Sequence, residues 1–238
     1  MLDLGRSLIA VAERSGRATA IVDGTLRLTY AEWLDRVLRI AGGLSALGLR
    51  HGDHVLSVLQ NRWEAATLHW ACQLGGLVMT PLNWRAKGDE IDYCVEDAGA
   101  KIVFLQDVSA AAVAASRKAG ALPRIAVGGI GGSTGVFEDL LEATPAAAVP
   151  TGSAEDISLM LYTSGTTGKP KGVPRRHRQE RAAAVAHVAQ NLYARGERTL
   201  GVMPLYHTMG VRSLLAMALI EGVFVCLPRF DVPGALAL

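Results

Sequence analysis

An excess of charge of one sign, paired cysteines and long hydrophobic runs are all missing from this sequence. Its 24 Lys and Arg residues nearly balance its 22 Asp and Glu residues, which leaves a formal net charge of +2. A charge so close to zero gives no reason to expect nucleic-acid binding or a basic membrane-binding patch. Half of the 238 residues are hydrophobic, which excludes a disordered chain and is enough for a sizeable core.

The cysteines exclude two kinds of small, cross-linked domain. There are three of them, Cys72, Cys94 and Cys226, at wide spacing and without a C-x-x-C pair. Neither a disulfide framework nor a zinc ribbon fits an odd number at such spacing. We therefore expect three buried thiols in a reducing cytoplasm.

The sequence shows no targeting or membrane-spanning segment. Its first fifteen residues contain four charged side chains and no long apolar stretch, unlike a signal peptide. A membrane-spanning helix needs about 20 apolar residues, and the best candidate, 214–228, is interrupted by Glu221. We therefore expect a cytoplasmic protein without a membrane span.

Short apolar runs that are typical of strands alternate with longer segments of helical periodicity. Many of the strand-like runs are apolar throughout, as expected for strands covered by helices on both faces. This alternation predicts an α/β fold with mostly parallel sheets flanked by helices. The strands are expected at 19–23, 54–59, 78–82, 101–106, 124–127, 157–162, 199–203 and 223–227. The helices are expected at 30–47 with Thr29 as N-cap, 63–77, 89–98, 108–119, 137–143, 179–194 and 211–220.

Two stretches bear on domain organisation. Residues 144–154 are rich in Pro, Gly and small residues without periodicity, which predicts a linker or a surface connection within one domain. Near the end of the chain, the strand 223–227 is followed by the start of another helix at Asp231. Because a compact domain rarely stops at such a point, we expect residues 1–238 to be the incomplete N-terminal part of something longer.

A polar, glycine-rich segment follows the strand 157–162. Residues 163–172 are all Ser, Thr, Gly, Lys or Pro. The glycines let the backbone approach a ligand closely, the hydroxyl and N–H groups supply hydrogen-bond donors, and Lys169 and Lys171 supply positive charge. These properties favour a polyphosphate-binding loop. The alternative, a solvated surface loop, would be costly to order without a ligand.

The segment is not a Walker A loop. That motif needs four residues between its glycines and a Ser or Thr after its Lys. Here two residues separate Gly165 from Gly168, and Pro170 follows Lys169. We therefore expect a phosphate site of another kind.

Three segments together resemble a known family. Tyr162–Val173, which reads Y-T-S-G-T-T-G-K-P-K-G-V, resembles the signature loop of the adenylate-forming (ANL, AMP-binding) superfamily of acyl-CoA synthetases, peptide-synthetase adenylation domains and luciferases. Pro81-Leu82-Asn83 followed by Glu90–Tyr93 resembles the family's P-L-N…E-L-x-Y stretch, and Met203–His207 resembles its P-L-[FY]-H motif. The resemblance covers 29–227. It implies the N-terminal part of the large domain of an adenylate-forming enzyme, with the mobile C-terminal domain outside this chain.

The resemblance implies ATP-dependent activation of a carboxylic acid. The carboxylate attacks the α-phosphorus of ATP to give acyl-AMP and pyrophosphate, and the thiol of coenzyme A then displaces AMP. Mg²⁺ that bridges the phosphates is implied with ATP. In this reading Lys171 is catalytic because it offsets the charge of the leaving pyrophosphate, and Thr163 belongs to the metal site. The implied phosphate-binding residues are Thr163, Ser164, Gly165, Thr166, Thr167, Gly168, Lys169 and Lys171.

His207 is the second candidate catalytic residue, and Tyr206 and His207 form the substrate pocket that the resemblance implies. His207 follows a strand and precedes a helix, where α/β sheets bind ligands; the alternative is a histidine that merely satisfies its hydrogen bonds at a strand end. An amino-acid substrate would need a carboxylate partner for its ammonium group, yet 205–220 contains no Asp or Glu. This favours an uncharged fatty, short-chain or aromatic acid, and so the acyl-CoA synthetase branch of the ligases.

Two alternative functions are left open by the sequence. The chain could be a non-catalytic nucleotide-binding fragment, or part of an acyl-AMP ligase that loads a carrier protein instead of coenzyme A. The family's adenine, ribose and catalytic-lysine motifs are not found before Leu238, so we expect the isolated chain to make little or no acyl-CoA. The expected partners are small molecules; no nucleic-acid partner is expected, and a homodimer is left open.

Two further groups have ordinary structural interpretations. Most of the basic run is interpreted as the solvated start of the helix 179–194, with a contribution to the phosphate field as the secondary alternative. The apolar residues after His207 are interpreted as core, with an apolar acyl pocket as the alternative. The basic run comprises Arg175, Arg176, Arg178 and Arg181, and the apolar group comprises Met209, Val211 and Leu214.

Overall fold

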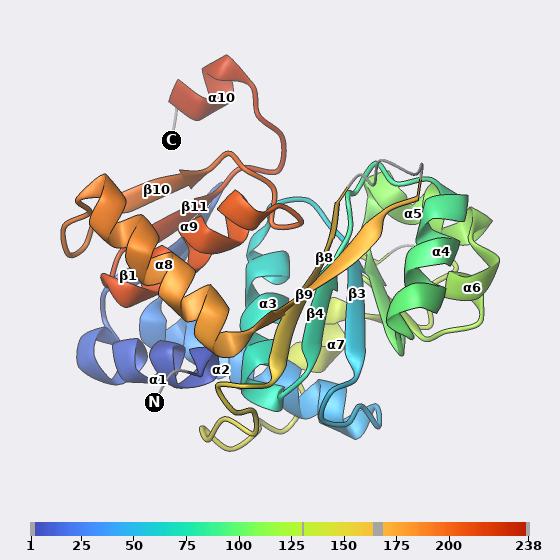
Figure 1. The fold of residues 1–238 in the computed structure, drawn as a ribbon, viewed down its shortest axis with the longest axis horizontal. Helices are drawn as coiled ribbons and strands as arrows, with labels where there is room; N and C mark the ends of the chain where they lie inside the picture. The colour runs from blue at the N-terminus through green and yellow to red at the C-terminus, as the bar shows by residue number, and fades with distance from the viewer. Residues whose placement is uncertain (1–2, 130, 164–168, 237–238) are drawn as a thin grey trace.

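The structure, a computed structural model, describes residues 3–129, 131–163 and 169–236. These residues form two β-sheets with helices packed between and around them (Figure 1). Within each sheet most neighbouring strands are parallel. The predicted α/β class with mostly parallel sheets and flanking helices is therefore confirmed.

The larger sheet has seven described strands in the order β7-β6-β5-β3-β4-β8-β9. All its pairings are parallel except the last, in which β8 and β9 form an antiparallel hairpin. Its strands are β3 (His54–Val58), β4 (Val78–Pro81), β5 (Ile102–Leu105), β6 (Arg124–Ala126), β7 (Gly135–Val136), β8 (Ile157–Thr163) and β9 (Lys171–Arg176).

The smaller sheet has four described strands in the order β10-β11-β1-β2. Strands β10, β11 and β1 run parallel, whereas β1 and β2 form a hairpin. The carboxyl end of β10 therefore lies on the same side as those of β11 and β1. The strands are β1 (Thr19–Asp23), β2 (Leu26–Thr29), β10 (Arg198–Gly201) and β11 (Val223–Cys226).

Ten helices are described. Local sequence sets several of their ends: Thr29 and Glu32 form a capping box at the start of α2, as the N-cap prediction requires, and Gly76 and Gly99 end α3 and α4 in the left-handed conformation. The helices are α1 (Leu4–Ser15), α2 (Tyr30–Ala46), α3 (Trp63–Gly75), α4 (Gly88–Ala98), α5 (Asp107–Ala115), α6 (Arg117–Gly120), α7 (Phe137–Leu141), α8 (His177–Asn191), α9 (Thr208–Leu219) and α10 (Val232–Leu236).

Helix α3 joins the two sheets into one core. It lies between them in Figure 1 and is buried along almost its whole length. One hydrophobic cluster contains Ile21 and Phe224 of the smaller sheet, Val55 of the larger sheet and Trp70 of α3. The indole of Trp33 on α2 also donates to Thr67 of α3 over 2.9 Å. The relative position of the two sheets is thus fixed by shared packing.

The predicted helix 108–119 is wrong in one respect, because the structure contains two helices there. Ser116 is extended between α5 and α6, and its hydroxyl accepts a hydrogen bond from Ala119 N–H and donates to Asp92 over 2.5 Å. Serine competes well with the helical backbone in such positions. An Ala-rich run hides this break from a reading based on periodicity.

The interpretation of most of the four arginines as a solvated helix start is wrong for two of them. Arg175 and Arg176 lie in β9, and α8 begins at His177. Arg175 is only 23% exposed and forms an ion pair of 3.0 Å with Glu180. Pro174 within this strand is tolerated because β9 is the edge strand of its sheet.

Helix α1 adds an element that the sequence reading did not assign, while Val211 and Leu214 are buried in the core as interpreted. All three cysteines are free and buried, as predicted. Among the described residues, none of the helices has both the length and the apolar character needed to cross a membrane.

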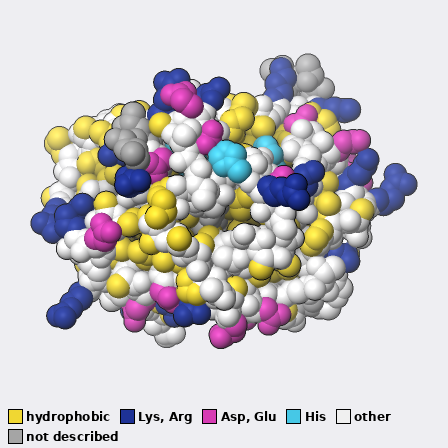
Figure 2. All heavy atoms as spheres, turned by 90° about the horizontal axis from the view of Figure 1, so that it is seen from below, with side chains coloured by type: hydrophobic (Ala, Val, Ile, Leu, Met, Phe, Trp, Pro, Cys, Tyr) yellow, Lys and Arg dark blue, Asp and Glu magenta, His cyan; other side chains and the backbone are white. Residues whose placement is uncertain are grey.

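Residues 144–154 contain no helix or strand and connect α7 to β8. Two backbone hydrogen bonds connect them to helices. Ala146 N–H donates to the carbonyl of Leu38 on α2, and Thr151 N–H donates to the carbonyl of Leu74 on α3. This connection runs along the underside of Figure 1, which is the face seen in Figure 2, where hydrophobic side chains spread across the middle.

Candidate functional site

A pocket of about 450 Å³ opens where β4 and β8 end. It brings together three segments that are far apart in the sequence: Pro81–Asn83, Tyr162–Thr163 and Tyr206–His207. Ligands of α/β sheets bind outside the carboxyl ends of parallel strands, and the three segments lie at such ends. The described lining residues are Pro81, Leu82, Asn83, Ala86, Glu90, Cys94, Tyr162, Thr163, Pro170, Tyr206 and His207.

One side of the pocket is the β8–β9 hairpin. Thr163 pairs with Lys171 across the hairpin, and Tyr162 pairs with Gly172. Thr163, Lys169 and Lys171 are exposed, and the Lys169 ammonium lies 5.6 Å from the centre of the Tyr93 ring. Thr163 therefore lines the pocket, and two lysines stand on the adjoining residues 169–171. Five predicted phosphate-binding residues, Ser164, Gly165, Thr166, Thr167 and Gly168, lie outside the described residues.

Helix α4 supports this hairpin through two contacts that the sequence did not reveal. The Tyr162 hydroxyl donates to the Asp97 carboxylate over 2.7 Å, and the Tyr93 and Tyr162 rings meet edge to face at 6.5 Å. Burial and the hydrogen bond to Asp97 raise the pKa of Tyr162, so its hydroxyl stays protonated and remains a donor. A carbon added at Gly172 would lie 3.2 Å from Asp97, so the hairpin packs closely on α4.

The other side of the pocket is the loop between β10 and α9. His207 is the N-cap of α9, and its backbone N–H donates to Pro204 over 2.9 Å. Its side chain is exposed and lines the pocket beside that of Tyr206. The imidazole is thus available to a ligand rather than engaged as a buried support.

Asn61, just after β3, holds this loop from the other sheet. Its side-chain NH₂ donates to the carbonyls of Gly201 and Met203, and its oxygen accepts from Leu205 N–H, each over 2.7 Å. Asn61 is 4% exposed. The sequence reading missed it, although its place at the carboxyl end of a predicted strand was a usable signal.

The pocket also contains one carboxylate and one thiol that the sequence reading did not assign to the site. Glu90 accepts a hydrogen bond from Lys87 N–H over 2.8 Å, which caps α4. Burial, with the charges of Asp97 and Glu90, raises the pKa of Cys94 to about 12. Cys94 is therefore an uncharged lining group.

The described residues offer little that would hold a resident metal ion. No group of three His, Cys, Asp or Glu side chains suited to a metal occurs among them. Thr163, the predicted metal residue, supplies one hydroxyl oxygen. Because Mg²⁺ at phosphate sites keeps water and phosphate oxygens as most of its ligands, Thr163 fits an ion that arrives on the phosphates of a nucleotide.

A family model and curated relatives both match almost the whole of this chain. A family model described as AMP-binding enzyme matches residues 8–237. Feruloyl-CoA synthase of an Amycolatopsis species is 34% identical over 232 residues, which cover 98% of this chain and 45% of that protein. The long-chain-fatty-acid–CoA ligase FadD13 of Mycobacterium tuberculosis is 29% identical over 233 residues, with 97% and 46% covered. The chain spans about half the length of the curated relatives it matches.

Solved structures share the fold. The inhibitor-bound N-terminal domain of FACL13 from Mycobacterium tuberculosis superposes with a TM-score of 0.86 at 28% identity, covering 100% of this chain and 60% of that one. ATP-bound MatB from Rhodopseudomonas palustris gives a TM-score of 0.86 at 29% identity, covering 100% and 47%.

Proposed function

Because this chain belongs to the family of AMP-binding enzymes, we propose that the complete protein is an acid–CoA ligase. It would use ATP to convert a carboxylic acid to acyl-AMP, with release of pyrophosphate. The thiol of coenzyme A would then attack the acyl carbon, form a thioester and expel AMP. Residues 1–238 would be the N-terminal part of the large domain, and a mobile C-terminal domain would complete the site.

The observation that carries this proposal is the shared pocket. Its hairpin side offers Thr163 with Lys169 and Lys171 close by, and its loop side offers Tyr206 and His207. A reaction between a carboxylate and a triphosphate needs an anion-binding region next to a region that orients the acid. The pocket lining supports the acid-orienting region, and Thr163 with the neighbouring hairpin lysines supports the anion-binding one.

At the hairpin, the proposed work is electrostatic. Pyrophosphate leaves with additional negative charge, and fixed cations and N–H donors stabilise charge that develops in the transition state. Lys171 would take this role, Lys169 and Thr163 would hold the β- and γ-phosphates, and Thr163 would also contact the accompanying Mg²⁺. The remaining proposed contacts are Ser164, Gly165, Thr166, Thr167 and Gly168.

At the loop, His207 and Tyr206 would orient the acid. His207 would hydrogen-bond the reacting carboxylate and Tyr206 would cover the group attached to it. We propose an uncharged fatty, short-chain or aromatic acid, since 205–220 has no carboxylate to pair with a substrate ammonium, and Glu90 is already hydrogen-bonded as a helix cap. The names of the relatives, which include feruloyl-CoA synthase and 2-succinylbenzoate–CoA ligase, support coenzyme A as acceptor.

An ATP–pyrophosphate exchange screen of the complete protein against a panel of carboxylic acids tests the first half-reaction. We expect exchange that depends on one class of uncharged acid, and no exchange with amino acids. Addition of coenzyme A or of a phosphopantetheine-loaded carrier protein then tests the second half. Exchange without thioester formation on coenzyme A would favour a carrier-loading ligase, and nucleotide binding without exchange would favour a non-catalytic protein. The isolated chain should form little or no acyl-CoA.

A further inference from the structure

The loop that carries Tyr206 and His207 forms few hydrogen bonds within itself. Val202 and Met203 are 41% and 40% exposed. Gly201 is the last residue of β10, and beyond it the chain runs through Met203 to α9 without forming a described strand. A segment of this kind needs partners for its backbone if it is to hold a side chain in place.

Asn61 supplies those partners. Both of its side-chain N–H donors and its oxygen are used, each in a hydrogen bond of 2.7 Å to the backbone of residues 201–205. The side chain is 4% exposed, so water cannot readily replace these bonds. Three short bonds from one amide leave the loop little freedom on that side.

Gly210 restrains the same loop from the helix side. A carbon added at Gly210 would lie 2.1 Å from the Pro204 carbonyl oxygen and 2.6 Å from that of Met203. The first turn of α9 therefore packs directly on the loop backbone. Asn61 thus bonds the backbone of Gly201, Met203 and Leu205, and Gly210 packs on that of Met203 and Pro204.

The two sides of the pocket belong to different sheets, and Asn61 connects them. Asn61 follows β3 of the larger sheet, which also provides Thr163 and the β8–β9 hairpin. The loop it binds follows β10 of the smaller sheet. We propose that Asn61 is a positioning residue, which sets His207 at the correct distance from the hairpin so that an acid bound at His207 meets the α-phosphorus of ATP. This inference rests on the proposed function above.

The proposal predicts a selective defect. Asn61→Ala in the complete protein removes all three bonds, and the acid-binding side should shift while the hairpin stays in place. We expect the kcat/KM for the acid to fall about 100-fold, the scale of a misplacement of roughly 1 Å, while the KM for ATP stays within about twofold. Gln60→Ala is the matched control, because the neighbouring Gln60 side chain accepts a hydrogen bond from Gln106, the N-cap of α5, and not from the loop after β10. It should leave both parameters near wild type.

Two further variants separate positioning from general support of the fold. Asn61→Asp keeps the size and the acceptor for Leu205 N–H but removes both donors. Its activity relative to wild type should rise as the pH falls, because a protonated carboxyl regains one donor. Gly210→Ala should displace the same loop from the opposite side and raise the KM for the acid without raising that for ATP.

The outcomes are distinguishable. Unchanged kinetics for the acid in folded Asn61→Ala, or an equal loss for acid and ATP, would overturn the positioning role. Failure of all three variants to fold would overturn it too, since Asn61 would then support the fold rather than the site. Wild-type protein without acid-dependent exchange would instead refute the proposed function.

Discussion

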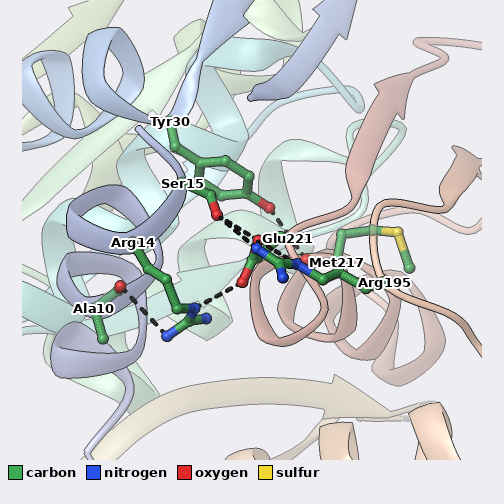
Figure 3. A network of polar contacts seen from close by, with 7 residues as sticks. All are labelled: Ala10, Arg14, Ser15, Tyr30, Arg195, Met217 and Glu221. Carbon is green, nitrogen blue, oxygen red and sulfur yellow. Dashed lines mark hydrogen bonds and ion pairs between the residues drawn. The ribbon is translucent and has the colours of Figure 1, made fainter. Parts of the chain in front are cut away.

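The smaller sheet is tied to the rest of the molecule differently at its two ends. At the carboxyl end of β10, the neutral Asn61 amide binds backbone groups and is buried. At the amino ends of β1, β10 and β11, the charged Glu221 binds side chains from two other connections (Figure 3). The first junction faces the candidate site and the second faces away from it.

The Glu221 junction is a network of ions. Glu221 accepts hydrogen bonds from Arg14 Nε and Arg195 Nε, each over 2.6 Å, and from the Ser15 hydroxyl. These bonds lower the pKa of Glu221 to about 2. In Figure 3 the three donors converge on one carboxylate, and the Tyr30 hydroxyl nearby donates to the carbonyl of Met217 over 3.1 Å.

The two ends of the smaller sheet therefore contribute differently to catalysis and to stability. Changes at the carboxyl end should alter catalysis, whereas changes at the amino end should alter stability alone. Substitutions at single residues test whether catalysis and stability depend on different ends.

Lys171→Ala should reduce ATP–pyrophosphate exchange by about 100-fold or more in the complete protein, because it removes a cation from developing negative charge. Lys171 is exposed at the end of the hairpin, so the unfolding temperature should stay unchanged. Lys171→Arg should retain part of the activity, and Lys118→Ala, which loses only a surface ion pair with Glu96, should retain all of it. Exchange at the wild-type rate in Lys171→Ala would remove Lys171 from the mechanism.

Glu221→Gln should lower the free energy of unfolding by about 2 kcal/mol, since bonds to a charged acceptor are weakened while exposed arginines recover some solvation. The kinetic constants should not change. Glu96→Gln, which loses an exposed ion pair, serves as the control and should cost much less. Urea unfolding measures both, and a kinetic defect in Glu221→Gln would break the separation between the two ends.

Acid should destabilise the fold through the buried histidines of α3 and α8. Burial, with a contribution from His177, lowers the pKa of His69 to about 3. The folded state favours neutral His69, so its contribution is complete above the unfolded pKa of about 6.5 and is lost as the pH falls toward 3. We expect this group to cost about 1 kcal/mol between pH 7 and pH 5.5.

His69→Gln should flatten that dependence in unfolding experiments over the same pH range. His177 faces Asp3, Asp156 and His51, and burial lowers its pKa as well. Some dependence should therefore remain in the variant. The Glu221 contribution is separate, because its depressed pKa means that its stabilisation is lost only between about pH 4.5 and 2.

Tyr162→Phe should have the smallest effect. It removes the hydrogen bond to Asp97 but keeps the ring packed against Tyr93. We expect the KM for ATP to rise by no more than about fivefold, because one hydrogen bond contributes about 1 kcal/mol. Tyr193→Phe provides the control at a distance. A larger rise in the KM for the acid than in that for ATP would contradict the assignment of Tyr162 to the hairpin side.

The sequence predicts eight of the eleven described strands, because buried parallel strands have a strong apolar signal, but it misses β2, β7 and β9. The strand β9 escapes prediction because its sequence is basic, contains Pro174 and has no apolar alternation. The break at Ser116 escapes because Asp92, its partner, comes from another helix.

Single polar side chains of the site are harder to predict from the sequence than the strands are. Asn61 and Asp97 act on backbone or hydroxyl groups more than 60 residues away in sequence. The place of Asn61 after a predicted strand is a usable signal, but a lone carboxylate such as Asp97 carries no pattern that distinguishes such a role from a solvated surface position. Only the folded arrangement shows which of them holds the pocket.

The three free thiols are all buried, and burial raises the pKa of each. Thiol-directed dyes react with the thiolate form, so the wild-type chain should be nearly inert toward them. A cysteine introduced at an exposed position such as Leu192 would then be the one fast-reacting attachment point. Fluorescent or spin-labelled versions of residues 1–238 could be prepared without first removing these three cysteines.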